Sequence, residues 1–261
     1  MHVSLIITTY NRVDALSLVL RSIEGQTISP KEVVIADDGS TEETQKMILD
    51  FQKNSSLNII HSWQKDEGFR AAKSRNKAIA KSSGNYMVLI DGDMVLHPKF
   101  IEDHINNAEL GYFVQGTRAL LTQNATQETL EKINIHFSFF SQGIQNRKNT
   151  IYSNFLSRLF SKKKNYLRGI KTCNMAFFKQ DCININGFNN SFEGWGREDS
   201  EFIVRLLNSG ICRKNLRFNA IQFHLWHNES VRVSLEQNDT ILKNAIDNGV
   251  KWCNGGIDRY L

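Results

Sequence analysis

The first 115 residues alternate between short apolar runs and stretches with helical spacing. The apolar runs, each of a length typical for a buried strand, are Val3–Thr9, Glu32–Ala36, Leu57–Trp63 and Tyr86–Ile90. The stretches that favour helices are Val13–Gln26, the residues after Ser40 and Thr41, Phe69–Lys81 and Phe100–Asn107. Alternation of this kind predicts an α/β fold with a mainly parallel central sheet flanked by helices.

The pattern weakens after Leu121 and becomes regular again from Thr172. We expect one more strand before this point, at Phe113–Leu121, and strands at Asn174–Phe178 and Arg217–Leu225 after it. We expect helices at Gln127–Ile135, Glu198–Asn208 and residues 231–247. No internal repeat is visible.

Composition excludes several classes of protein. The four cysteines show no C-x-x-C spacing, which favours reduced thiols over a disulfide framework or a zinc site. The N-terminus enters a strand directly and lacks the pattern of a signal peptide. No apolar stretch reaches the ~18 residues of a membrane span. We therefore expect a soluble or peripheral protein of the cytoplasm.

The net charge of +5 is concentrated in a basic segment at residues 147–171, which contains no Asp or Glu. Its cations are Arg147, Lys148, Arg158, Lys162, Lys163, Lys164, Arg168 and Lys171. Phe155, Leu156, Leu159 and Phe160 add a partial helical apolar stripe. Such a segment can lie on anionic lipid or form a solvated loop. No nucleic-acid-binding motif accompanies it, so we expect no nucleic-acid partner.

The run Tyr86–Ile90 ends in Asp91, Gly92 and Asp93. Residues i and i+2 of a strand point the same way, so the two carboxylates can project together. Paired carboxylates suit Mg²⁺ or Mn²⁺, which usually also hold substrate phosphates. An ordinary Asp-Gly turn after a strand is the alternative interpretation.

Polar residues also close the first two strands. The first ends in Thr8, Thr9, Tyr10, Asn11 and Arg12, and the second in Asp37 and Asp38. In a parallel sheet these ends open on the same edge as Asp91 and Asp93, where α/β sheets bind ligands. Neither G-x-G-x-x-G nor a P-loop motif occurs, so a dinucleotide site or a P-loop is not indicated.

Glu198 and Asp199 form a second acidic pair, at the start of a predicted helix. A helix N-terminus favours the carboxylate form, as a general base requires, although acidic capping alone explains the pair equally well. Gly194, Trp195 and Gly196 precede the pair and favour the ligand interpretation. The glycines allow close backbone approach to a ligand, and an indole can stack on a sugar.

On these motifs the chain resembles the inverting glycosyltransferases of family 2, which have the GT-A fold. The resemblance rests on Ile6–Asn11, Val33–Ser40, Gly68 with Ala71–Asn76, and Leu89–Asp93. Lys65–Ala72 is similar to the chondroitin-polymerase type, and Gly194–Asp199 to a galactosyltransferase-like C-terminal module. Together these segments span residues 3 to about 227.

The resemblance implies a role for most of these residues. Asp38 would bind the uracil, Asp91 would lie near the ribose, and Asp93 would bind the metal. Residues Thr8 to Arg12, Gly68, Arg75 and Gly92 would belong to the donor site. Arg75 would neutralise phosphate or hold the strand of Asp91, with a surface arginine as the alternative.

For the other half of the site, the resemblance implies Asp199 as the base beside Glu198. Gly194 to Arg197 would line the acceptor and donor-sugar site, and Asn174 would lie under the acceptor site. Arg197 stands where many relatives have glycine, which would alter sugar choice or acceptor charge. His224 or His227 would complete a Mn²⁺ or Mg²⁺ site, with Mn²⁺ favoured and one of the two histidines structural.

The sequence thus predicts a metal-dependent glycosyltransferase that moves a galactose-type or N-acetylhexosamine sugar from a UDP-sugar to a glycan or lipid-linked acceptor. We expect a Rossmann-like nucleotide-sugar half at residues 1–115, an acceptor half at 116–230 and a C-terminal helix or tail at 231–261. The expected role is surface polysaccharide synthesis, such as capsule or lipopolysaccharide, at the cytoplasmic face of the inner membrane. A sugar nucleotidyltransferase and a non-catalytic UDP-sugar-binding subunit are the alternatives.

Overall fold

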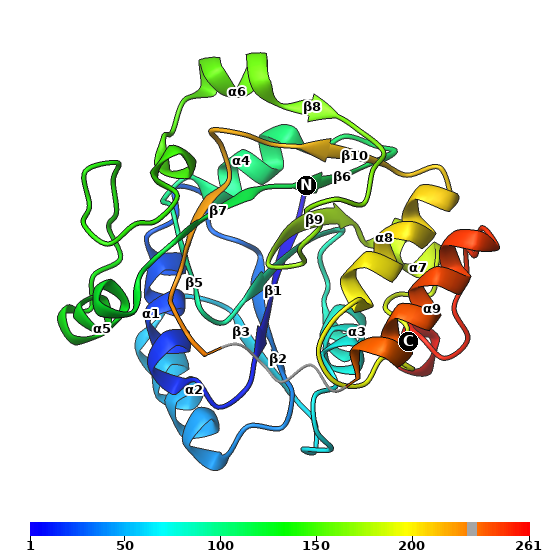
Figure 1. Cartoon of the computed structure of the whole chain (residues 1–261). Coiled ribbons are helices and arrows are strands. Elements are labelled where there is room, and N and C mark those ends of the chain that lie inside the picture. Colours follow the sequence, from blue (N-terminus) through cyan, green and yellow to red (C-terminus); the bar gives the residue numbers. More distant parts are fainter. Residues whose placement is uncertain (229–233) are drawn as a thin grey trace.

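The computed structural model describes residues 1–228 and 234–261, and an eight-stranded sheet forms its centre (Figure 1). The strands lie in the order β3-β2-β1-β4-β9-β6-β10-β8. Only β9 and β8 run against the direction of the others, so the expected mainly parallel sheet is confirmed. The strands are β1 Val3–Thr9, β2 Glu32–Asp37, β3 Ile59–Trp63, β4 Tyr86–Asp91, β6 Tyr112–Gln115, β8 Lys162–Lys163, β9 Asn174–Phe178 and β10 Cys212–Asn215.

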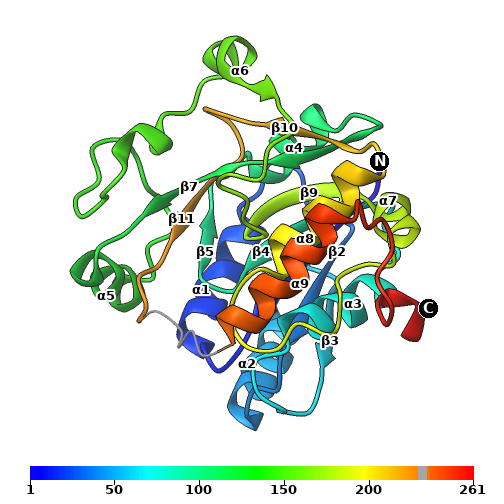
Figure 2. The same ribbon diagram turned by 45° about the vertical axis from the view of Figure 1, so that its right-hand side comes forward.

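Helices cover both faces of this sheet, because successive side chains of each buried strand point to opposite faces. Leu5 and Ile7 pack against α1 (Val13–Glu24), α2 (Glu42–Asn54) and α4 (Phe100–Asn107). Ile6 packs on the other face, against α3 (Ala71–Lys81), α7 (Lys179–Asn184) and α8 (Glu198–Asn208). The two layers lie on either side of the strands in Figure 1 and Figure 2.

A second sheet of three strands joins residues from the middle and the end of the chain, in the order β5-β11-β7. Its strands are β5 Met94–Leu96, β7 Thr117–Leu120 and β11 Ile221–His224. The remaining elements are α5 Gln123–Lys132, η1 Arg147–Thr150, α6 Asn154–Phe160, α9 Leu235–Asp247 and η2 Ile257–Arg259. Because β5 follows β4 after two residues, this small sheet borders the end of β4.

The strand expected at Phe113–Leu121 is wrong as a single element, because it is divided between the two sheets at Gly116. A Cβ atom at Gly116 would lie 2.3 Å from Oδ1 of Asn174. The backbone can bend past the Asn174 side chain there only because residue 116 has none.

The strand expected at Arg217–Leu225 is shorter than expected, since only Ile221–His224 is extended and paired. Phe218 and Ala220 have φ angles of 64° and 48°, in the left-handed region that interrupts a strand. Asp103 holds this turn, because its Oδ2 accepts a hydrogen bond from the Ala220 N–H at 2.8 Å.

The helix expected at Gln127–Ile135 lies earlier, as α5. Thr122 caps its first turn by accepting a hydrogen bond from the Ala125 N–H, and Ile133 ends it with a φ of 51°. The other helices and strands that the sequence predicts differ from the observed elements only at their ends. Residues 231–233 of the expected last helix, and the boundary after residue 230, lie outside the described residues.

Within residues 1–228 and 234–261, no helix is long and apolar enough to cross a membrane. All four cysteines are free thiols, in agreement with the sequence. β1 lies between β2 and β4 in the central sheet. The chain continues from the end of β1 to β2 on one side, whereas β4 lies on the other side of β1. The carboxyl ends of β1 and β4 therefore border the crevice at which α/β sheets bind ligands.

Candidate active site

Asp93 and two histidines converge at the junction of the two sheets. Asp93 lies in the turn between β4 and β5, and its carbonyl accepts a hydrogen bond from the Leu225 N–H at 3.0 Å. This bond draws the end of β11 against the turn. Nε2 of His224 and Nε2 of His227 lie 3.4 Å and 3.2 Å from Oδ2 of Asp93.

These three side chains fit a divalent metal ion. One potential ligand atom of each lies within 4.8 Å of the others. Oδ1 of Asp93 is buried and has no hydrogen-bond partner among the described residues. His227 hydrogen-bonds through Nδ1 to the Asn228 carbonyl at 2.7 Å, which leaves the lone pair of Nε2 free for a cation.

Electrostatics at this cluster favour ionised Asp93. Burial alone would raise the pKa of Asp93, but hydrogen bonds and charge from His224 and His227 lower it below its ordinary value. The hydrogen bond to Asp93 in turn raises the pKa of His227. An ionised carboxylate and two imidazoles form a donor set that a cation can use.

Arg75 connects the first acidic pair to the second. Its guanidinium is 4% exposed and donates to Glu198 Oε1 at 3.1 Å and to Thr8 Oγ1 at 3.1 Å. It also lies 3.7 Å from Oδ1 of Asp91. The alternative of a surface arginine is therefore wrong, because Arg75 on α3 joins the ends of β1, β4 and α8.

Asp91 and Asp199 lie on either side of this arginine. Burial raises the pKa of Asp91, and the Arg75 charge opposes that shift. Burial and the neighbouring charge of Glu198 raise the pKa of Asp199 to about 7. Desolvation and a second carboxylate therefore outweigh the helix N-terminus, which by itself would favour the ionised form of Asp199.

Asp38 lies at the other end of the crevice. It is 4% exposed and accepts hydrogen bonds from the Arg70 N–H at 2.7 Å and from Gln64 Nε2 at 2.6 Å. Burial raises its pKa against these two hydrogen bonds. Arg70 follows the turn of Gly68, whose φ is 80° and whose N–H donates to Asp66.

The residues after β1 form the wall between Asp38 and Asp93. Thr9 is buried, Tyr10 is half exposed and donates to Asp66 Oδ2 at 3.0 Å, and Asn11 has a φ of 48°. Gly92 packs against this wall, because a Cβ atom there would lie 3.0 Å from Thr9 Oγ1.

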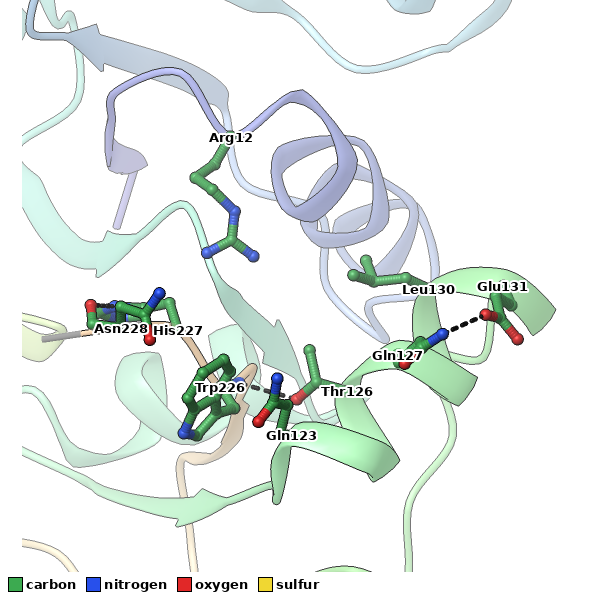
Figure 3. Close-up of a pocket in the computed structure, with 9 residues that line it drawn as sticks. All are labelled: Arg12, Gln123, Thr126, Gln127, Leu130, Glu131, Trp226, His227 and Asn228. Carbon is green, nitrogen blue, oxygen red and sulfur yellow. Dashed lines mark hydrogen bonds between the residues drawn. The ribbon is translucent and has the colours of Figure 1, made fainter.

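A cavity of about 390 Å³ lies beside the histidines (Figure 3). Arg12, at the start of α1, points into it opposite Trp226 and His227, and α5 closes the far side. Arg12 therefore lies at the histidine end of the site and contacts Asp14 at 3.3 Å.

The segment Gly194–Arg197 is fixed in place by α9. Asn238 donates to the carbonyls of Glu193 and Gly196 at 3.1 Å and 2.9 Å. The Gly194 N–H donates to Phe69 O at 3.0 Å, so the segment also meets the loop of Gly68. Trp195 is 39% exposed. The C-terminal helix α9 thus holds this segment in place, a role of α9 that the sequence did not predict.

Arg197 caps α8 with a φ of 75°, a left-handed conformation that glycine adopts more readily. Its Nε donates to Asp239 on α9 at 2.5 Å. The arginine side chain therefore contributes a contact to α9.

Asn174 is buried beside Ile90 of β4 and does not line the crevice. It is 1% exposed, and its side chain bonds to His104 Nε2 at 3.0 Å and to the carbonyls of Thr117 and Ala220 at 2.7 Å and 2.8 Å. With these partners, Asn174 joins β9 to the small sheet and has no surface for a ligand.

Two cations near the site were missed from the sequence. Burial raises the pKa of Asp91, and the charge of Arg118 on β7 is one of the charges that oppose this rise. Burial and then the Arg118 charge lower the pKa of Lys171, and Asp199 opposes that shift. No motif marks Arg118 in the sequence. Lys171 stands at the end of the basic segment, where it was counted only as part of a surface charge.

These features define a class of protein: an α/β fold with a crevice at the carboxyl ends of its parallel strands, a cluster that could hold a metal ion and a separate carboxylate pair. The model of the glycosyl transferase family 2 matches residues 4–182, and the chain belongs to this family. Residues 156–227 match a model described as the N-terminal domain of galactosyltransferase. Membership of this family supports a glycosyltransferase over the alternative of a sugar nucleotidyltransferase.

The chain is similar to polysaccharide synthases but covers only part of them. It is 27% identical to a chondroitin synthase of Escherichia coli over 248 residues, which is 85% of this chain and 34% of the relative. It is 28% identical to a hyaluronan synthase of Pasteurella multocida, over 82% of this chain and 23% of the relative.

Crystal structures of TarS from S. aureus share the GT-A fold. The complex with UDP-GlcNAc aligns with a TM-score of 0.64 and 17% identity, over 100% of this chain and 69% of TarS 1–349. The complex with UDP gives a TM-score of 0.62 and 15% identity, over 100% of this chain and 68% of TarS 1–349. At this identity the likeness establishes the fold alone.

Proposed function

We propose that the protein is a metal-dependent, inverting glycosyltransferase that uses a UDP-sugar donor. One observation carries the proposal: the cluster of Asp93, His224 and His227 lies beside Asp91, which Arg75 connects to Glu198 and Asp199. Sugar transfer from a nucleotide diphosphate needs a cation that stabilises the leaving diphosphate and a carboxylate that accepts a proton from the acceptor, and these groups could supply both.

Asp93, His224 and His227 would hold the metal ion. Two imidazole nitrogens beside one carboxylate favour Mn²⁺ over Mg²⁺, which prefers oxygen ligands. When bound, the ion supplies positive charge that stabilises the departing diphosphate. Both histidines are then ligands, a departure from the expectation that one of them is structural.

Asp199 acts as the general base in this proposal. It takes the proton of an acceptor hydroxyl while that oxygen bonds to the anomeric carbon and the bond from this carbon to UDP breaks. A single displacement inverts the anomeric centre. A pKa of about 7 suits a base at neutral pH, since it combines an available carboxylate with sufficient basicity.

Glu198 and Arg75 act as positioning residues in the same proposal. Their ion pair, at 3.1 Å, holds the start of α8 against the end of β1. Arg75 is occupied by Glu198, Thr8 and Asp91 and therefore holds the strand of Asp91. It is not free to neutralise phosphate.

The donor would lie along the wall of residues Thr8 to Arg12, with uracil toward Asp38 and Gly68 and ribose toward Asp91 and Gly92. The sugar would lie toward Gly194, Trp195, Gly196 and Arg197. TarS binding of UDP and UDP-GlcNAc supports a UDP-sugar, and the galactosyltransferase match supports a galactose-type or N-acetylhexosamine sugar. Residues 1–115 would form the donor half and residues 116–230 most of the acceptor half.

The acceptor in this proposal is a glycan or a lipid-linked saccharide of a surface polysaccharide such as capsule or lipopolysaccharide. The similarity to chondroitin and hyaluronan synthases supports a polysaccharide product. A lipid-linked acceptor would bring the enzyme to the cytoplasmic face of the inner membrane.

The basic segment supports contact with an anionic membrane. α6 stands apart from the helices that cover the central sheet, at the top of Figure 1 and Figure 2. Phe155 and Leu159 on this helix are 70% and 59% exposed, next to Lys162 and Lys164. Exposed apolar side chains beside cations favour the interface of an anionic bilayer.

UDP release from a panel of UDP-sugars tests the proposed function. We expect hydrolysis of one donor with Mn²⁺, inhibition by EDTA, and loss in Asp93→Ala because the metal site loses its carboxylate. Asp50→Ala, which removes an exposed carboxylate of α2, is the matched control and should retain activity. If UDP does not bind in the presence of Mn²⁺, the proposal is wrong.

A further inference from the structure

Arg118 faces the same side of the small sheet as the metal-ligand cluster. In the pairing of β7 with β11, Arg118 lies opposite Gln222 and Leu120 lies opposite His224. Since side chains alternate along a strand, Arg118 and Leu120 share a face, and Ala119 points the other way into the core. Arg118 thus projects on the face where His224 meets Asp93.

Lys171 reaches the same region from the other side. Two hydrogen bonds from the Gln115 side chain hold the backbone of Lys171. Gln115 Nε2 donates to Lys171 O at 2.9 Å, and Gln115 Oε1 accepts from the Lys171 N–H at 3.3 Å. Burial lowers the pKa of Lys171, the Arg118 charge lowers it further, and Asp199 raises it. Lys171 also stands two residues before Cys173, whose Sγ accepts the hydrogen bond of Arg118, so the two cations belong to one region of the structure.

Neither cation has an anionic partner in residues 1–228 and 234–261: no carboxylate lies within 4.0 Å of either group. The Arg118 guanidinium makes one long hydrogen bond, from NH1 to Cys173 Sγ at 3.5 Å. Its Nε is buried and has no partner among the described residues. Arg75, by contrast, meets two carboxylates and a hydroxyl.

The Arg118 guanidinium is partly buried and its Nε has no partner among the described residues, so a bound anion would stabilise its charge, and the exposed Lys171 ammonium adds positive charge from the surface. The geometry points to Arg118 and Lys171 as a subsite for an acidic group, a carboxylate or a phosphate, on the sugar that lies beside Asp199. This inference rests on the proposed function and deepens it, because it names the substrate class as an acidic saccharide. A guanidinium is well suited to this task, since it binds an oxyanion with two parallel hydrogen bonds.

The acidic group can belong to the transferred sugar or to the acceptor, and two binding experiments distinguish these sources. In the first, UDP-glucuronate competes with UDP-glucose, and UDP-galacturonate with UDP-galactose, for the Mn²⁺-loaded protein. In the second, the complex with UDP and Mn²⁺ is titrated with the methyl glucuronide, the methyl glucoside and their galacto counterparts. We expect the acidic member to bind at least about tenfold more tightly in one of the two experiments, as for a charge-assisted hydrogen bond.

Arg118→Gln and Lys171→Gln should each reduce this preference by about tenfold while UDP affinity changes less than about twofold. Lys162→Gln, which removes a cation of the exposed strand β8, is the matched control and should behave like the unaltered protein. Lys171 is exposed at the surface, so Lys171→Gln remains informative if Arg118→Gln does not fold.

Two results would overturn the inference. Equal binding of acidic and neutral sugars in both experiments would exclude an acidic saccharide. A loss of UDP affinity in both variants as large as the loss of preference would assign the cations to the diphosphate. If the unaltered protein fails to bind UDP at all, the proposed function fails first, which separates the two failures.

Discussion

Among single residues, Asp199 links the chemistry of the site to the stability of the protein. Its pKa is raised from 3.8 to about 7, first by burial and then by Glu198. The folded protein therefore retains a proton on Asp199 between about pH 4 and pH 7, which the unfolded chain has already released. By linkage, this group contributes stability below pH 4 that is lost as the pH rises through 7.

Asp199→Asn should therefore lower the rate of transfer by about 10²–10⁴-fold, as expected when a general base is removed. At pH 8 without ligands it should also raise the free energy of unfolding by up to about 4 kcal/mol, because no buried carboxylate must ionise and each of the roughly three pKa units is worth about 1.4 kcal/mol. At pH 4 the two proteins should be equally stable. Thermal unfolding at both pH values, with donor hydrolysis, measures these effects.

Asp14→Asn, which alters an exposed carboxylate, is the control for Asp199→Asn. An equal gain in stability at pH 4 and pH 8 would contradict the assignment of the raised pKa to Asp199. The rate of the unaltered protein should rise with pH through about 7 as the base ionises.

At the scale of secondary-structure elements, Gly116 separates the two sheets. Gly116→Ala should lower the free energy of unfolding by about 1–3 kcal/mol, since its Cβ would lie 2.3 Å from Asn174 and the core would be overpacked. Urea unfolding measures this difference. Gly25→Ala is the matched control, because a Cβ there is 3.7 Å from its nearest neighbour and φ is −81°, so its effect should be small.

The helix α6 carries the proposed membrane contact. Phe155→Ser with Leu159→Ser should abolish sedimentation with anionic vesicles and leave the melting temperature unchanged, because both side chains are exposed. Ile246→Ser, an exposed apolar residue of α9, should leave sedimentation unchanged. Equal binding of all variants, or no binding of the unaltered protein, would remove the membrane from the proposal.

At the scale of the whole molecule, ligands should stabilise the fold through the crevice, because they bind residues contributed by both sheets. Mn²⁺ and UDP together at about 100 times their dissociation constant should add about 2.7 kcal/mol, or roughly 5–10 °C in melting temperature. EDTA should reverse the shift. Asp93→Ala should show no shift, and a shift unaffected by EDTA would argue against a metal in the site.

The sequence by itself determined most of the longer helices and strands and where the polar groups stand on them. Asn174–Phe178 and Glu198–Asn208 have the bounds that their patterns predict. Local periodicity suffices for this, because it records which side of each element is buried. The same patterns placed Asp91 and Asp93 at the end of a buried strand and Glu198 and Asp199 at the start of a helix.

Only the tertiary structure decided which of these groups meet and how they are charged. The ion pair of Arg75 with Glu198 spans 123 residues of sequence, and no local pattern specifies it. The pKa of Asp199 depends on burial and on a neighbouring carboxylate, which reverse the shift that its helix position predicts. Arg118 and Lys171 likewise come together only in the folded protein. The pairing of β7 with β11 positions Arg118, and a hydrogen bond from Gln115 to the Lys171 carbonyl positions Lys171.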